Sequence, residues 1–203
     1  YKVLLCTIAP VILSATVYNI SNIVDQTMFS NIMSAQGMAE REYSSLLGML
    51  NGQYDTMTNI PLSVSSALAS SFIPSLVATI QTGNRNKIHS KFNIVSRFIM
   101  MIAIRCAAGF VSLAGPLLDL LFFTQDNAFA ALMLRIGGIS VVFFCLSTVT
   151  TAALQGLDEM SKPVKNAAIS LVIHVASLFI MLVVFKWGIY SIPVSKIIFA
   201  ASI

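Results

Sequence analysis

The sequence predicts an all-α membrane protein, a polytopic bundle of transmembrane helices. Hydrophobic residues make up 57% of its 203 positions and charged residues only 10%, whereas about 25% of residues are charged in an ordinary soluble domain. A helix needs ~20 apolar residues to cross the hydrocarbon core of a bilayer. Four uncharged runs reach about that length, at residues 3–24, 56–84, 136–157 and 166–185.

These runs and the residues beside them predict five full spans and the start of a sixth. A further apolar run, at residues 98–118, is interrupted only by Arg105. Gly115-Pro116 ends that span and begins a half-helix over residues 116–124, which is too short to cross and is expected near the outer surface. We place the spans at residues 3–34, 43–80, 88–112, 127–156 and 162–187, with a truncated one at 190–203.

The chain begins with Tyr1 and runs directly into apolar sequence, without the basic region and cleavage site of a signal peptide. We therefore expect it to be an internal fragment of a longer protein.

Basic residues alternate between the predicted loops and set the orientation of the spans. Loops on the cytoplasmic side of a membrane carry an excess of Lys and Arg. The segments with that excess are predicted to be cytoplasmic, so the first span runs from inside to outside. They are Lys2, Arg85 with Lys87 and Lys91, and Lys162 with Lys165. This placement explains the net charge of +4 without a nucleic-acid partner.

Two prolines in the second predicted span indicate a bent helix. Pro61 and Pro74 each remove a backbone donor, which kinks a helix. In a bilayer the freed carbonyl groups must be satisfied by neighbouring helices, side chains or water. The second span is therefore expected to pack against other helices.

The sequence lacks the motifs of the common enzyme and nucleotide-binding sites. It has no P-loop, no G-x-G-x-x-G and no H-E-x-x-H pattern, and its only histidines are His89 and His174. Cys6, Cys106 and Cys145 lie apart inside apolar runs, so neither a metal site nor a disulfide framework is indicated. We predict that the protein is not an enzyme and needs no cofactor or metal.

Polar residues recur at helical spacing on the first two predicted spans, and each set falls on one face of its helix. The first span carries Asn22 and Asp25, and the second carries Asn51, Asp55 and Asn59. At ~1.5 Å per residue, both carboxylates fall near the outer boundary, where solvated interfacial groups are one interpretation. The other is that the two stripes line a watery cavity or a helix contact, which makes these five residues candidate cavity residues.

Ionisable residues deeper in the spans are the remaining candidates, because such groups are costly in a bilayer. Arg105 lies about 21 Å along its span from the cytoplasmic end, and His174 is central in the fifth span. Arg105 either contacts substrate, pairs with a carboxylate or snorkels to an interface, and His174 is either functional or a packing residue. Arg135 and Lys196, nearer the outside, either attract an anionic group or act as anchors.

Several short stretches, in order over about 160 residues, resemble a known family. They are Asn59-Ile60-Pro61, Ala67-Leu68-Ala69, Ile73-Pro74-Ser75-Leu76, Gly115-Pro116-Leu117-Leu118, Ala153-Leu154-Gln155-Gly156-Leu157 and Lys162-Pro163-Val164-Lys165-Asn166. The family is the bacterial polysaccharide and lipid-linked oligosaccharide flippases, which includes the stage V sporulation protein B type and the lipid II flippases. It belongs to the multidrug/oligosaccharidyl-lipid/polysaccharide exporter (MOP) superfamily.

The resemblance implies that residues 1–203 are a fragment of the C-terminal lobe of a two-lobed exporter of about fourteen spans. The N-terminal lobe of the same chain would complete a central cationic cavity, lined by the opening spans of each lobe. Alternating access would move an undecaprenyl-pyrophosphate-linked glycan, a peptidoglycan precursor or polysaccharide repeat unit, to the outer leaflet of the bacterial plasma membrane. The implied partners are this lipid-linked oligosaccharide and membrane lipids.

One feature departs from the family. Its members carry arginines on the early spans, whereas the first two spans here have no Arg or Lys within the membrane. Arg105 or the other lobe would then supply the positive charge. We predict a flippase driven by membrane potential or an ion gradient, closer to the sporulation-type branch. The alternatives are a multidrug or cation antiporter of the same superfamily and an intramembrane glycan-modifying enzyme.

Overall fold

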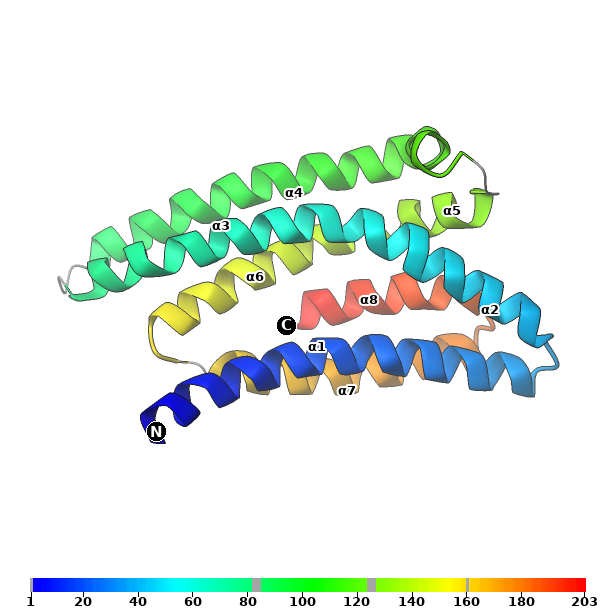
Figure 1. Cartoon of the computed structure of the whole chain (residues 1–203), viewed down its shortest axis with the longest axis horizontal. Coiled ribbons are helices and arrows are strands. Elements are labelled where there is room, and N and C mark those ends of the chain that lie inside the picture. The colour runs from blue at the N-terminus through cyan, green and yellow to red at the C-terminus, as the bar shows by residue number, and fades with distance from the viewer. Residues whose placement is uncertain (1, 82–84, 124–126, 160) are drawn as a thin grey trace.

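The computed structural model describes the backbone of residues 2–81, 85–123, 127–159 and 161–203. It also describes their side chains, apart from those of residues 2–15, 17, 18 and 85. The described residues form helices and no strands (Figure 1). The predicted fold class, an all-α membrane helix bundle, is confirmed.

The first part of the chain, residues 2–81, forms two long helical stretches. Helix α1 (Lys2–Ala35) is followed by α2 (Glu40–Met49), which continues through a π-helical turn, η1 (Leu50–Tyr54), into α3 (Asp55–Gln81). Figure 1 shows the stretch from α2 to α3 as one arch. Pro61 and Pro74 both lie inside α3, and the kinks expected at them remain predictions.

Helix α4 (Arg85–Leu121) contains the break that was expected near Gly115-Pro116. Leu113 has non-helical φ and ψ angles of −114° and 18°. Pro116 has no N–H for the carbonyl four residues earlier and its ring crowds that carbonyl, which accounts for a break at this point. The helical piece after the break ends at Leu121, and the end of the half-helix predicted over 116–124 lies outside the described residues.

The second half of the chain contains a bent helix pair, a long helix and a short one. Helices α5 (Ala128–Gly137) and α6 (Ser140–Gly156) meet at 49°. Helix α7 (Ser161–Val183) leads through the 3-10 turn η2 (Gly188–Tyr190) into α8 (Ser191–Ser202).

Length and composition identify the helices able to cross a membrane. Within the described residues there are three, Glu40–Gln81, Asn86–Leu121 and Ser161–Val183, and a fourth if the bent pair α5–α6 is one span. The apolar stretch Gly188–Ser202 is shorter than these. That α1 and α8 cross a bilayer stays a prediction.

The helices pack as two groups joined by α8. Helices α3, α4 and α6 contact one another, and α1 packs along α7. Helix α8 lies between the groups and contacts α5, α6 and α7 (Figure 1). In the view of Figure 1, α1 and α3 lie on opposite sides, and α8 and part of α6 are seen between them.

The outer surfaces of the long helices are apolar. Ile94 and Ile104 on α4 are 64% and 54% exposed, and Ile169 and Val172 on α7 are 60% and 69% exposed. Exposed apolar side chains along helices of spanning length are suited to contact with lipid. The chain is a multi-pass membrane protein.

Candidate functional site

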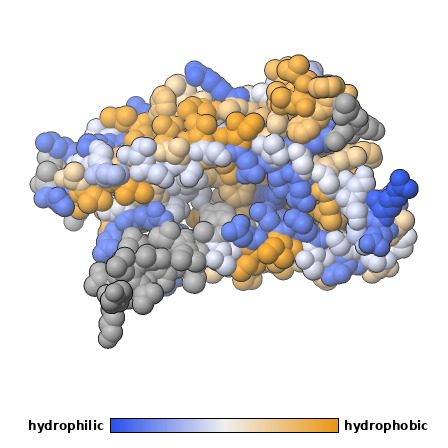
Figure 2. Space-filling view, in the orientation of Figure 1, coloured by the Kyte–Doolittle hydropathy of each residue, from blue (hydrophilic) through white to orange (hydrophobic). Residues whose placement is uncertain are grey.

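A cavity of about 530 Å³ lies between α1, α3, α6 and α8. Figure 2 shows hydrophilic residues along the hollowed middle of this face, with hydrophobic patches above and below them. Most of the polar groups that line the cavity are hydroxyls and amides rather than charges. They are Ser21, Asn22, Thr58, Asn59, Ser63, Ser66, Ser70, Ser140, Thr148, Thr151 and Gln155.

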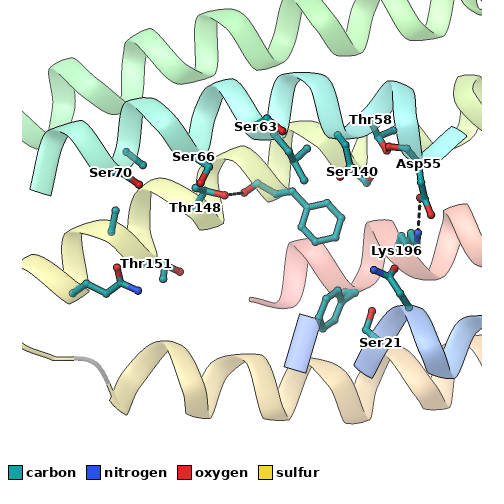
Figure 3. Close-up of a pocket in the computed structure, with 18 of the residues that line it drawn as sticks. Ser21, Asp55, Thr58, Ser63, Ser66, Ser70, Ser140, Thr148, Thr151 and Lys196 are labelled. Carbon is teal, nitrogen blue, oxygen red and sulfur yellow. Dashed lines mark hydrogen bonds and ion pairs between the residues drawn. The ribbon is translucent and has the colours of Figure 1, made fainter. Parts of the chain in front are cut away.

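Helical periodicity explains how one wall of the cavity is built. On α3, Asp55, Asn59, Ser63, Ser66 and Ser70 follow one another at steps of three or four residues and therefore share a face. Figure 3 shows the labelled members of this row along the side of α3 that turns toward α6 and α8. The polar stripe predicted on the second span thus lies on the cavity wall, apart from its first member.

The charged part of the wall is an ion pair between α3 and α8. Lys196 Nζ donates to Asp55 Oδ1 at 2.8 Å (Figure 3). Among the described residues that line the cavity, these two alone carry charge, and their charges have opposite signs. The described wall is therefore close to neutral overall.

A buried tyrosine of the cavity wall contacts the lysine. The Nζ atom of Lys196 lies 5.6 Å from the centroid of the Tyr54 ring, within the range of a cation–π contact. The ring packs against Gly137 at the end of α5, where an added Cβ would overlap with it. Tyr54 ends the π-helical turn and is 1% exposed, so the glycine makes the room that this tyrosine needs.

A second acid–base pair lies one side chain behind the cavity. Asp25 on α1 and His174 on α7 approach to 2.7 Å between Oδ1 and Nε2. His174 Nδ1 lies 3.1 Å from the backbone carbonyl oxygen of Ser195 on α8. The ring of Phe199, which lines the cavity, packs on the imidazole with 5.1 Å between centroids.

The other predicted site residues lie outside the cavity. Asn51 is exposed and accepts a 3.3 Å hydrogen bond from Gln26 of α1. Arg105 and Arg135 are exposed and do not line the cavity. Of the nine residues proposed from the sequence, Asn22, Asp55, Asn59 and Lys196 line it, and Asp25 and His174 form the pair behind it.

The part of the cavity wall that α6 forms was not predicted from the sequence. Thr148, Thr151 and Gln155 line the cavity but sit in an uncharged apolar run. The Thr148 hydroxyl donates to the Phe144 carbonyl oxygen at 2.8 Å, as hydroxyls in membrane helices often do. A hydroxyl that can be satisfied by its own helix gives no signal of what it faces, although the spacing of these residues places them on one side.

A polar cavity between apolar membrane helices is a feature of helical membrane transporters. Comparison with known proteins agrees. Over 170 residues the chain is 24% identical to Lipid II flippase MurJ of Bacillus subtilis (strain 168), covering 82% of this chain and 30% of the flippase. A MOP superfamily transporter from Pyrococcus furiosus Vc1 (DSM3638) has the same fold, with a TM-score of 0.70 and 12% identity.

That structural match covers 95% of this chain and 40% of the transporter, so the chain spans well under half the length of either relative. Comparison with protein-family models gave no match. The resemblance of this chain to the flippases and exporters of the MOP superfamily is confirmed. Both relatives are named as transporters and neither as an enzyme, in agreement with the prediction that this chain is not an enzyme.

Proposed function

We propose that this chain is part of a transporter that flips an undecaprenyl-pyrophosphate-linked glycan from the inner to the outer leaflet of the bacterial plasma membrane. The observation that carries the proposal is the cavity rich in hydroxyls and amides within an apolar helix bundle. The likeness to a protein named as a lipid II flippase supports the substrate class.

The composition of the wall suits the neutral part of such a substrate. Sugars and peptides present many hydroxyl and amide groups, and Ser, Thr, Asn and Gln side chains both donate to and accept from them. The pyrophosphate needs positive charge. Arg105 lies outside the cavity and Lys196 is paired with Asp55, so we propose that an N-terminal lobe of the same protein supplies most of that charge.

The orientation follows from the basic loops and is part of the proposal. Lys2, the 85–91 segment and the 162–165 segment face the cytoplasm in it. The cavity then extends from the middle of the span formed by α2 and α3 toward its cytoplasmic end, and the partners are membrane lipids and the lipid-linked substrate.

Translocation of lipid II by the full-length protein in vesicles tests the proposal. In Asn59→Leu, a cavity amide is lost, and we expect the rate to fall about tenfold, the effect of ~1.4 kcal/mol. The matched control is Asn51→Leu, the same change outside the cavity, which should retain the rate, as should Arg105→Ala. If the wild-type protein does not translocate lipid II, the proposed substrate is wrong. If Asn59→Leu leaves the rate unchanged, the cavity is not the path of the substrate.

A multidrug antiporter is a second candidate, because two aromatic rings stand in the cavity wall. Phe144 and Phe199 meet edge to face with 6.1 Å between centroids, a surface on which an aromatic cation can stack. Efflux of a lipophilic cation from the same vesicles, with no movement of lipid II, would favour this function.

A further inference from the structure

The proton content of the Asp25–His174 pair follows from its hydrogen-bond partners. A carbonyl oxygen only accepts, so the bond to Ser195 places a hydrogen on Nδ1 of His174. The 2.7 Å contact between Nε2 and Asp25 Oδ1 then needs one more proton between the two atoms. That proton lies either on the imidazole, giving an ion pair, or on the carboxyl group, giving two neutral partners.

Removing that proton leaves a nitrogen lone pair facing a carboxylate. The pair is neutral with the proton and carries one negative charge without it. Asp25 and His174 are 1% and 0% exposed, so this charge would have little contact with water, and a buried uncompensated charge is costly. The second oxygen of Asp25, Oδ2, has no hydrogen-bond partner among the described residues.

The surrounding charges do not replace the proton. The titratable and charged groups nearest the pair are Lys196 on α8 and Tyr54 in η1, each close enough to Asp25 for an electrostatic interaction. Lys196 is held by Asp55 of α3. Helix α6 has no Asp, Glu, Lys, Arg or His, and its thiol, Cys145, accepts a hydrogen bond from Ser65 of α3. The lysines of α7 lie in its first turns.

We propose that the Asp25–His174 pair is a proton-binding site and that its proton holds α1 against α7 and α8. When the proton passes to solvent, the carboxylate and the neutral imidazole repel and α1 moves away from α7. Asn22, one turn before Asp25 on α1, lines the cavity, so this movement displaces a part of the cavity wall. The site is independent of the identity of the substrate proposed above.

The test measures the distance between α1 and α7 as a function of pH. Spin labels replace Ile23 and Val172, which are 63% and 69% exposed, in the full-length protein with its native cysteines changed to serine, in lipid nanodiscs. From mildly acidic to alkaline pH, we expect a second population at longer distance to appear. Asp25→Asn should abolish it, because an amide donates to Nε2 with a hydrogen that does not titrate. Asp55→Asn, the same change in the other pair, should keep it.

Each result decides the proposal without any substrate. A label distance that does not change with pH in the wild type overturns it, and so does a pH response that persists in Asp25→Asn. If Asp25→Asn does not fold, His174→Gln replaces it, since its amide donates to Asp25 with no titrating hydrogen and the pH response should again vanish. Loss of lipid II translocation alone would overturn the proposed function and leave this site standing.

Discussion

Two acid–base pairs join helices on opposite sides of the cavity, and they differ in environment rather than in geometry. Asp25 and His174 lie 2.7 Å apart with side chains 2% and 0% exposed. Asp55 and Lys196 lie 2.8 Å apart with side chains 22% and 10% exposed, on the cavity wall. The first links α1 to α7 and the second links α3 to α8.

The difference determines what each pair is able to do. The buried pair, Asp25–His174, is called the sealed pair here, and the pair on the cavity wall, Asp55–Lys196, the open pair. The sealed pair can exchange nothing larger than a proton, because water does not reach either side chain. The open pair borders the cavity, and an ammonium group offers three donors of which Asp55 takes one. A ligand entering the cavity meets Lys196 and Asp55 directly, whereas it meets Asp25 and His174 only through a change in how α1 packs. Variants of each pair, compared by the stability of the full-length protein in mixed micelles, test this contrast.

The largest effect is expected at the sealed pair. His174→Leu leaves the Asp25 carboxylate buried without its partner, which costs about 3–5 kcal/mol when one member of a buried pair is removed. The double variant Asp25→Leu/His174→Leu removes both polar groups and should recover most of the loss. Reversible unfolding measures both, and a single variant as stable as the wild type would show that the pair is not sealed.

The next effect concerns the tyrosine beneath the open pair. Gly137→Ala places a methyl group where the Tyr54 ring lies, and overpacking of this kind costs about 1–3 kcal/mol. Gly109→Ala on α4 is the matched control, because nothing lies within 4 Å of its added Cβ. It should be neutral or slightly stabilising. Equal stabilities of the two variants would mean that Tyr54 moves freely and does not position Lys196.

These two pairs also show which features of the protein can be predicted from its sequence and which cannot. The fold class was predictable because the length of an apolar run relates directly to bilayer thickness. The stripe on α3 was predictable because helical periodicity fixes which residues share a face. The ion-pair and hydrogen-bond partners on other helices were not predictable. His174 is 149 residues from Asp25 and Lys196 is 141 from Asp55, and which helices meet depends on tertiary packing that no local pattern encodes.

Charge and depth alone do not tell which residues line the cavity. Arg105 was a candidate because a charged residue inside a span is unusual, yet it is exposed on α4, away from the cavity. Its long apolar stem makes that position tolerable in a membrane protein. Lys196 was noted without a partner, and the structure gives it one.

A smaller effect is expected at the open pair. Lys196→Met removes the ammonium group, but Asp55 is 22% exposed and water reaches the carboxylate through the cavity. We expect a loss of about 1 kcal/mol, between the values for surface and buried pairs. The exchange Asp55→Lys/Lys196→Asp keeps both charges and should restore stability. A loss as large as in His174→Leu would place both pairs in the same environment and remove the contrast.

The smallest effect is expected at a pair that water surrounds. Lys162 and Glu159 form an ion pair near the start of α7, with side chains 61% and 43% exposed. Exposed pairs gain little because solvent screens their charges and two long side chains lose freedom. Glu159→Gln should therefore change stability by about 0.3 kcal/mol or less, and added salt should remove even that difference. The loss of stability on removing one member would then follow the burial of the three acid–base pairs. A large loss in Glu159→Gln would contradict that order.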